Sequence, residues 1–514
     1  MKLLVWILMV ALSPLAAAQQ SPVVAKPRSE VKLTVERAEI WRALADFQRR
    51  LAEHGAFFES SRMIAVHRGV DSAMRPWWYG FGEADLGKLA ELTRSLRKTP
   101  EPEAETVARS LRVLPSPLVA IIGGNAVELS IDSQFPARWS GAQSLELVVR
   151  ATAPNGTTLD SKSFRVDPGE KLDIHTKVEF PPIPKPAPDD AKATTPIEPG
   201  VWRLELVARD TDAEPVALGN AWIVAGSLDV LRQANEAKLK ELEPKVAERR
   251  NASLTGAFAV LQARNALLSD TPSRQESARF TLDPIAHAAA IADEMAKLEK
   301  GLDPYRLLVG DLWRTLPVKQ DEKTVAVHVY APPNVAEAKP MPLVVVLGTI
   351  GGDENTVLDL MVPRLRQLAD QKGCLVVALR TSRDMLNDRR YDALFSELSD
   401  DYPIDSKRVY FFGHAAGAGQ LGLLLAQRGE RIAGLVSLGA SDIKFPASRH
   451  VPTIVVAGGA DELDGAEKMD KKSARYRSVT SAVDFKAIDN VGWYLLPDKA
   501  LEFGIDWLFQ RTLE

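Results

Sequence analysis

A short segment near the C-terminus has the spacing of a turn that carries a nucleophile. Residues 413–417, Gly-His-Ala-Ala-Gly, follow the apolar run 409–412 and precede a leucine-rich helical segment. A strand, a turn between two glycines and a helix form the nucleophile elbow, G-x-S-x-G, whose serine attacks a carbonyl carbon. The glycines are needed because other side chains would collide with the strand or the helix. The central residue here is Ala415, which has no nucleophilic atom.

Three hydroxyl side chains are weak substitutes for the missing serine. Ser437 and Ser441 lie on or just after a predicted strand, and Thr349 lies in the loop after another. A hydroxyl becomes nucleophilic when an imidazole takes its proton, and none of the three has a candidate histidine. We therefore assign no catalytic residue with certainty.

Four carboxylates offer the alternative of a metal site. Oxygen ligands suit Ca²⁺ or Mg²⁺, and the acidic residues in question are Asp353, Glu354, Asp461 and Asp464. A simpler interpretation is that Asp353 caps a helix that starts near Asn355 and that the others are surface or loop-capping acids. We expect no metal and no other cofactor.

Apolar runs separated by helix-length segments surround these residues. They cover 343–347, 375–379, 409–412, 435–438 and 453–457, and a last strand is predicted at 483–488. Runs this apolar, alternating with helices, are typical of parallel strands that are covered on both faces. The run 325–330 alternates instead, like an antiparallel strand. The sequence predicts an α/β domain over 311–514, with a mainly parallel sheet and helices on both faces.

This domain resembles the secreted α/β-hydrolase esterases, in particular the feruloyl-esterase and polyhydroxybutyrate-depolymerase-like group. The segments that carry the resemblance are 342–347 with 351–355, 405–410, 458–461 and 492–497. The resemblance implies that Ala415 occupies the serine position and Asp461 the acid position. It also implies that Asn490 lies where the histidine belongs, and that Gly348-Thr349 replaces the His-Gly of the oxyanion loop.

These departures affect three separate segments. The sequence has two histidines from the elbow onward. His414 lies within the turn, and His450 precedes a strand, at the wrong end of the sheet. Loss of one triad member typically lowers the rate by a factor of ~10⁴. We therefore expect a pseudo-hydrolase that acts by binding. The alternatives are an active carboxylic-ester hydrolase with a non-standard arrangement and a structural scaffold.

The backbone of the elbow can persist without its serine. If it does, Ala415 should have a positive φ, which costs about 1–2 kcal/mol in a residue other than glycine. A helical φ would mean that the turn has relaxed and that the resemblance ends earlier.

The first 310 residues fall into three parts by hydrophobic periodicity. Residues 29–114 are predicted to be helical, 115–226 to form an immunoglobulin-like β-sandwich, and 227–310 to be helical again. Within the sandwich, 181–200 contains seven prolines and should be an extended loop. The aromatic cluster 75–81 should fill a helical core; a ligand platform and an interdomain contact are the alternatives. Whether helices cover the hydrolase pocket stays open.

The N-terminus has the pattern of a secretory signal. In residues 1–18, Lys2 precedes an apolar stretch, and Ala16 to Ala18 provide a small-residue cleavage site. The stretch is shorter than the ~20 residues that span a bilayer, so we expect no membrane span after cleavage. The protein should be exported to a periplasm or to the medium. The single cysteine, Cys374, can form no internal disulfide and should lie in the core.

Composition narrows the partners only slightly. The chain of 514 residues is 46% hydrophobic and 26% charged, as in an ordinary globular protein. Its formal net charge of −4 argues against a nucleic-acid partner. A small molecule, a polymer or a protein stays possible as the ligand.

Overall fold

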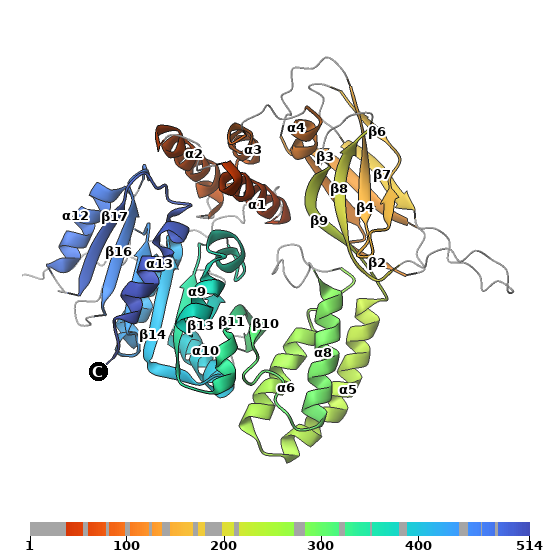
Figure 1. Ribbon diagram of the computed structural model, residues 1–514. Helices are drawn as coiled ribbons and strands as arrows, with labels where there is room; N and C mark the ends of the chain where they lie inside the picture. The colour runs from red at the N-terminus through yellow and green to blue at the C-terminus, as the bar shows by residue number, and fades with distance from the viewer. Residues whose placement is uncertain are drawn as a thin grey trace, which may run out of the picture. The chain divides into compact units, whose positions relative to one another are not determined.

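In the computed structural model, the part of the chain from Thr34 to Glu514 forms one compact unit. The structure describes residues 37–54, 60–78, 82–97, 103–122, 126–135, 144–167, 173–179, 198–209, 215–271, 283–317, 324–349, 352–379, 388–440, 451–463, 465–478 and 482–513 (Figure 1). The predicted signal peptide, 1–18, lies outside these residues, as does most of the proline-rich loop 181–200. Within the described ranges, no helix is both long and apolar enough to cross a membrane.

An eight-stranded sheet is the framework of the C-terminal part (Figure 1). Its strands, in spatial order, are β10 (Gly310–Pro317), β11 (Thr324–Ala331), β13 (Leu375–Leu379), β12 (Met341–Leu347), β14 (Ile404–His414), β15 (Gly434–Leu438), β16 (Thr453–Gly458) and β17 (Val483–Ile488). The pairs β10–β11 and β11–β13 are antiparallel, and every later pair is parallel. The mainly parallel sheet predicted from the apolar runs is therefore present.

Helices cover both faces of this sheet. They are α9 (Leu365–Lys372), α10 (Asp388–Asp401), α11 (Ala416–Arg428), α12 (Ala466–Arg477) and α13 (Leu496–Phe509). Side chains alternate between the faces of a strand. Val344 and Val346 of β12 share a core with α9 and α13, whereas Val345 and Leu347 share one with α10 and α11. Cys374 is buried in the first of these cores, as predicted.

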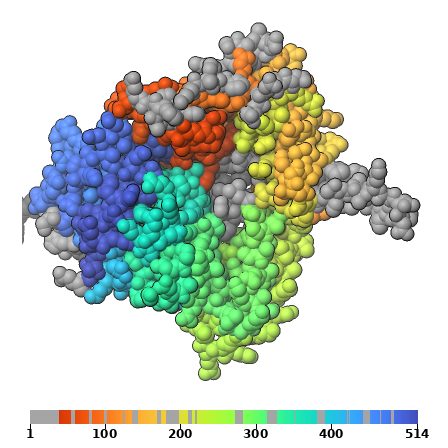
Figure 2. All heavy atoms as spheres, viewed as in Figure 1, coloured from red at the N-terminus to blue at the C-terminus, as the bar shows by residue number. Residues whose placement is uncertain are grey.

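Two groups of helices precede the sheet. The first comprises α1 (Arg37–His54), α2 (Ser60–Trp78), α3 (Leu86–Ser95) and α4 (Glu103–Ser110), and the second comprises α5 (Leu228–Glu248), α6 (Ala252–Asn265) and α8 (Pro284–Glu299). The atoms of the second group form one continuous surface, in yellow-green to green in Figure 2. Arg75 to Trp78, the first residues of the aromatic cluster 75–81, are the last turn of α2.

Two sheets share one core between these groups. The first contains β1 (Leu111–Ser116), β3 (Ala126–Ser133) and β7 (Asp173–Glu179); the second contains β2 (Val119–Ile121), β9 (Val216–Ala225), β8 (Gly200–Ala208), β4 (Leu145–Thr152), β5 (Thr158–Asp160) and β6 (Phe164–Val166). Both contribute side chains to the core around Trp202 and Trp222, whose ring centroids lie 5.7 Å apart. The immunoglobulin-like topology stays a prediction. β1 begins inside the segment predicted to be helical, because Leu111 and Val113 already alternate with half-buried neighbours.

Candidate functional site

The predicted elbow has the backbone of a nucleophile turn. β14 ends at His414, α11 begins at Ala416, and Ala415 between them has φ +50° and ψ −117°. The prediction of a positive φ is confirmed, so the turn has not relaxed. The backbone N–H of Ala415 donates to the carbonyl oxygen of Leu438 at 2.8 Å, which fixes the turn against β15.

The two glycines of the turn allow close backbone contacts. A Cβ on Gly413 would lie 2.8 Å from Cα of Ala418, and one on Gly417 would lie 2.6 Å from the carbonyl oxygen of Leu347. Real Cβ atoms essentially never approach this closely. The collisions expected from the sequence therefore exist, and they place the elbow against the carboxyl end of β12.

Side chains of the N-terminal helices occupy the space beside Ala415. Ala415 is only 3% exposed and belongs to the same buried cluster as Trp77 and Trp78 of α2. The ring of Trp78 lies 6.3 Å from that of Trp493 and 6.2 Å from that of Tyr494, between centroids. The aromatic cluster thus fills a core, as expected, but this core also includes the elbow. The helical segment covers the position above Ala415.

Two polar side chains of α2 bind the loop that follows β17. The Nδ1 atom of His67 accepts a hydrogen bond from the backbone N–H of Gly492 at 2.9 Å. The carboxylate of Asp71 accepts from the backbone N–H groups of Trp493 at 2.6 Å and Tyr494 at 2.7 Å. A Cβ on Gly492 would lie 2.7 Å from Asp71 Oδ2, so glycine permits this approach.

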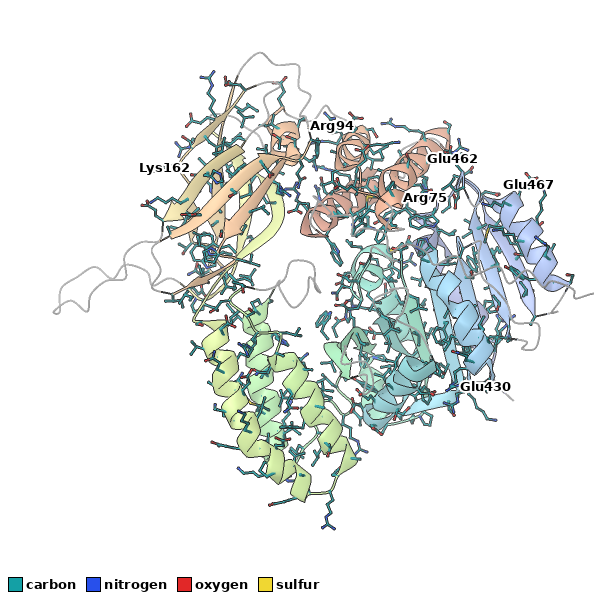
Figure 3. All side chains as sticks on the ribbon, turned by 180° about the vertical axis from the view of Figure 1, so that it is seen from behind. Arg75, Arg94, Lys162, Glu430, Glu462 and Glu467 are labelled. Atoms are coloured by element: carbon teal, nitrogen blue, oxygen red, sulfur yellow. The ribbon has the colours of Figure 1, made fainter. Side chains whose placement is uncertain are left out.

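A third side chain of α2 binds the candidate acid. Nη2 of Arg75 donates to Oδ1 of Asp461 at 2.8 Å, and the two side chains are 9% and 0% exposed. Figure 3 labels Arg75 at the end of its helix. The guanidinium also lies 5.3 Å from the ring centroid of Trp493, and Asp461 caps its own loop by accepting from the N–H of Leu463. Asp461 is therefore engaged by an arginine.

These three residues of α2 were not among the site residues predicted from the sequence. His67, Asp71 and Arg75 are spaced by four, which puts them on one face of a helix. The same spacing is common on solvated helix faces, so the pattern alone does not distinguish a buried docking face.

Burial favours the neutral forms of the first two groups. It lowers the pKa of His67 to about 4, with a smaller contribution from the charge of Lys499. Burial raises the pKa of Asp71 to about 6, although two backbone N–H groups and Arg75 favour the carboxylate; nearby Asp461 adds repulsion. At neutral pH the imidazole is uncharged, which leaves Nδ1 free to accept from Gly492.

Asn490 is not brought into this cluster. It lies in the turn after β17, with an exposed side chain and φ +60°, a conformation that asparagine tolerates better than most residues. The chain turns inward only afterwards, at Val491 and Trp493, which are 7% and 0% exposed. Of the three candidate positions, Ala415 and Asp461 meet α2, whereas Asn490 lies at the surface.

The substitute nucleophiles are poorly placed. Ser437 on β15 is 0% exposed and Thr349 is 1% exposed, and neither hydroxyl has a hydrogen-bond partner in the described part of the chain. An ester cannot reach a hydroxyl that is closed off from solvent in this way. Ser441 lies outside the described residues.

The ring of His414 is engaged by Trp493 and is not available as a catalytic base. Its Nε2 donates to the carbonyl oxygen of Trp493 at 3.1 Å, and the two rings lie 4.4 Å apart. Burial lowers its pKa to about 3, so the ring stays neutral. His450 lies outside the described residues.

The acidic residues considered for a metal have structural roles where they are described. Oδ1 of Asp353 accepts from the N–H groups of Asn355 at 3.0 Å and Thr356 at 2.9 Å, which caps the short helix Thr356–Met361 as expected. Asp464 lies outside the described residues. Among the side chains that the structure describes, no group of three or more His, Cys, Asp or Glu residues could hold a metal ion.

Comparison with known proteins gives hydrolases at low similarity. No protein-family model matches the chain, and no curated sequence does. A ferulic acid esterase matches 40% of this chain over 99% of its own, with 12% identity and a TM-score of 0.34. The fluorophosphonate-binding serine hydrolase FphF of Staphylococcus aureus matches 39% of this chain over 98% of its own, with 14% identity and a TM-score of 0.33. A thermostable esterase matches 79% of this chain over all of its own, with 12% identity and a TM-score of 0.33. At these scores the likeness carries no argument about activity.

Proposed function

We propose that the protein is an exported member of the α/β-hydrolase superfamily that has lost serine-esterase activity and acts by binding. The superfamily assignment is supported by the mainly parallel sheet with antiparallel strands at its start and by the elbow at the end of β14. Export is supported by the signal-like pattern of residues 1–18.

The observation that supports the loss of activity is that the turn at Ala415 is both strained and covered. Ala415 keeps a positive φ at a cost of about 1–2 kcal/mol, yet it presents only a methyl group. That methyl group is 3% exposed and lies in a core with two tryptophans of α2. A substrate carbonyl would find no nucleophile and no space.

The contacts of α2 also support a permanent rather than an accidental cover. They combine a buried ion pair, three hydrogen bonds from loop N–H groups and aromatic packing. Aromatic pairs contribute about 0.5–1.5 kcal/mol beyond the area that they bury. Removal of either member of a buried ion pair costs about 3–5 kcal/mol. Together these contacts oppose spontaneous opening.

A fluorophosphonate probe tests the proposal directly. The reagent labels activated serine hydroxyls, so the purified full-length chain should show no covalent adduct by intact-mass spectrometry, while an active serine esterase in the same tube is labelled. A labelled serine in peptides from 311–514 would overturn the proposal. As a second measurement, hydrolysis of nitrophenyl acetate should not exceed the rate in buffer.

Ester hydrolysis through a displaced serine is not supported by the described residues, because Ser437 is fully buried. If slow turnover is nevertheless found, Ser437→Ala and Ser441→Ala decide whether either hydroxyl carries it. Turnover abolished by one of these changes would establish the alternative.

A further inference from the structure

The eight-stranded sheet ends at β17, whose outer side pairs with no strand among the described residues (Figure 1). An edge strand presents backbone N–H and C=O groups to which a further strand can bind, and native edges are often bulged or charged to prevent this. β17 has six residues in regular register with β16, and no bulge interrupts the pairing. Its outer edge therefore has the geometry that strand addition requires.

Hydrogen bonds to β16 show which backbone groups of this edge point outward. The carbonyl oxygens of Ala482, just before β17, and of Ile488, at its end, accept from the backbone N–H groups of Thr453 at 2.7 Å and Gly459 at 2.8 Å. Backbone direction alternates along a strand, so the even-numbered residues point toward β16 and the odd-numbered residues point outward. The outward residues are Val483, Phe485 and Ala487.

The side chains of β17 alternate between the two helices that cover it. Phe485 packs against α12, whereas Asp484 and Lys486 lie on the side of α13. Nε1 of Trp507 donates to Asp484 at 3.0 Å, and Nζ of Lys486 lies 3.8 Å from the ring centroid of Phe503. Both charged residues are exposed. Opposite charges thus lie two positions apart on one face of the edge strand.

This charge pattern is complementary to its own reverse. In a two-fold symmetric contact, residue i of each copy meets residue j of the other. If two β17 strands pair antiparallel about Phe485, Asp484 lies opposite the partner's Lys486, and the outward backbone groups form about six hydrogen bonds. A register centred on Asp484 or on Lys486 would place like charges opposite each other, which is destabilising. The charges therefore favour a single register.

We propose that β17 docks a second copy of this chain, by antiparallel pairing of the two edge strands about a two-fold axis at Phe485. The two eight-stranded sheets then form one continuous sheet. A lysine on an edge strand normally opposes pairing, but here each lysine meets an aspartate. The proposal does not rest on the loss of esterase activity, because it concerns the outer edge of the sheet and not the elbow.

Charge reversal at the two exposed positions tests the proposal. Sedimentation equilibrium of the full-length chain at low salt should show a dimer, and a small interface of this kind should have a Kd in the micromolar range. Lys486→Asp sets two carboxylates opposite each other at both ends of the contact, so it should weaken the dimer by about ten-fold or more. Lys339→Asp makes the same charge change at a side chain that is 78% exposed elsewhere, and it should have no effect.

A mixture of two variants distinguishes direct pairing from a general effect of charge. Lys486→Asp gives an edge with two acids, and Asp484→Lys gives an edge with two lysines. Each variant alone should be mainly monomeric, whereas an equimolar mixture should form a heterodimer about as tight as the unchanged dimer. The double variant with both changes should dimerise by itself, because each aspartate again meets a lysine.

A proline tests the backbone part of the contact. The N–H of Ala487 points outward, so Ala487→Pro removes no hydrogen bond to β16, and proline is tolerated at such edge positions. It removes one donor from each strand of the dimer and should weaken association by about ten-fold. Ala487→Thr keeps the N–H, so it should change association by less than about two-fold.

The proposal is overturned if the unchanged chain has the monomer mass at concentrations far above micromolar, or if a dimer forms that neither Lys486→Asp nor Ala487→Pro weakens. It is also overturned if the mixture of charge variants stays monomeric, or if Lys339→Asp weakens the dimer as much as Lys486→Asp. None of these outcomes depends on fluorophosphonate labelling, so the two proposals can fail separately.

Discussion

Replacement of Arg75 by alanine removes one partner from a buried ion pair with Asp461, whose side chains are 9% and 0% exposed. The carboxylate of Asp461 would lose its arginine partner while it stays buried, so we expect the free energy of unfolding to fall by about 3–5 kcal/mol. Urea unfolding, followed by tryptophan fluorescence, measures the change, since Trp77, Trp78 and Trp493 all lie in the affected core.

A matched control lies on the same helix. Arg68 pairs with Glu462 at 3.4 Å, but these side chains are 50% and 67% exposed. Exposed pairs contribute about 0–1 kcal/mol, so Arg68→Ala should change the stability little. The double variant Arg75→Met with Asp461→Leu should recover most of the loss, because an apolar pair of similar volume avoids the desolvation cost.

Two results would refute this reasoning. One is a loss of less than about 1 kcal/mol for Arg75→Ala, which would mean that water reaches Asp461 readily. The other is equal losses for Arg75→Ala and Arg68→Ala, which would mean that burial does not decide the value of the pair.

Four further predictions concern the same region. In the folded protein His67 has a pKa of about 4, below the ordinary 6.5. Its contribution to the free energy of unfolding is therefore fully present above pH 6.5, and about 3 kcal/mol of it is lost as the pH falls through 4. In urea titrations from pH 7 to 4, the free energy of unfolding of His67→Gln should fall less than that of the unchanged protein. Asp71 has the opposite pH dependence, because its pKa is raised to about 6. Its contribution to the free energy of unfolding is fully present below about pH 3.8 and is lost as the pH rises through 6. Gly492→Ala should destabilise by about 1–3 kcal/mol in urea unfolding, because its Cβ would meet Asp71 and His67 at under 3 Å. Ala415→Ser should restore no hydrolysis of nitrophenyl acetate, because the new hydroxyl would be buried and no imidazole is available to it in the described residues.

Each of these has a control and a contrary outcome. An unchanged pH dependence in His67→Gln would mean that another group governs acid unfolding. Gly256→Ala has open space around its Cβ and lies on helix α6, so it should be neutral or stabilising by up to about 1 kcal/mol; equal effects at the two glycines would contradict the steric argument. Measurable turnover by Ala415→Ser would show that substrate reaches the elbow.

The parallel strands could be predicted because their information is local. β12 and β13 are buried on both faces, so the segments 343–347 and 375–379 are apolar without interruption. β10 was not among the predicted strands, because it lacks such an apolar run. Of its first residues only Leu312 is buried. The elbow was predictable for the same reason: its glycines and its strained residue are consecutive in the sequence.

The cover over the elbow could not be predicted, because it depends on contacts between distant segments. Nothing in the sequence near Asp461 indicates that Arg75 is its partner, and nothing near Gly492 indicates His67 and Asp71. The exposed position of Asn490 was missed for a related reason. A resemblance aligns positions along a loop, but the direction of each side chain depends on the φ and ψ of that loop.

The docking of α2 has a consequence for biosynthesis. Arg75 and Asp461 are separated by 386 positions, and Asp71 is separated from Trp493 by 422. At a synthesis rate of ~5–20 residues per second, α2 emerges about 20–80 s before the loops that receive it. During that interval Trp78 lacks its partners Trp493 and Tyr494, and the charged face of the helix lacks the loops that it binds. The native core around Ala415 can therefore form only after translation has nearly finished.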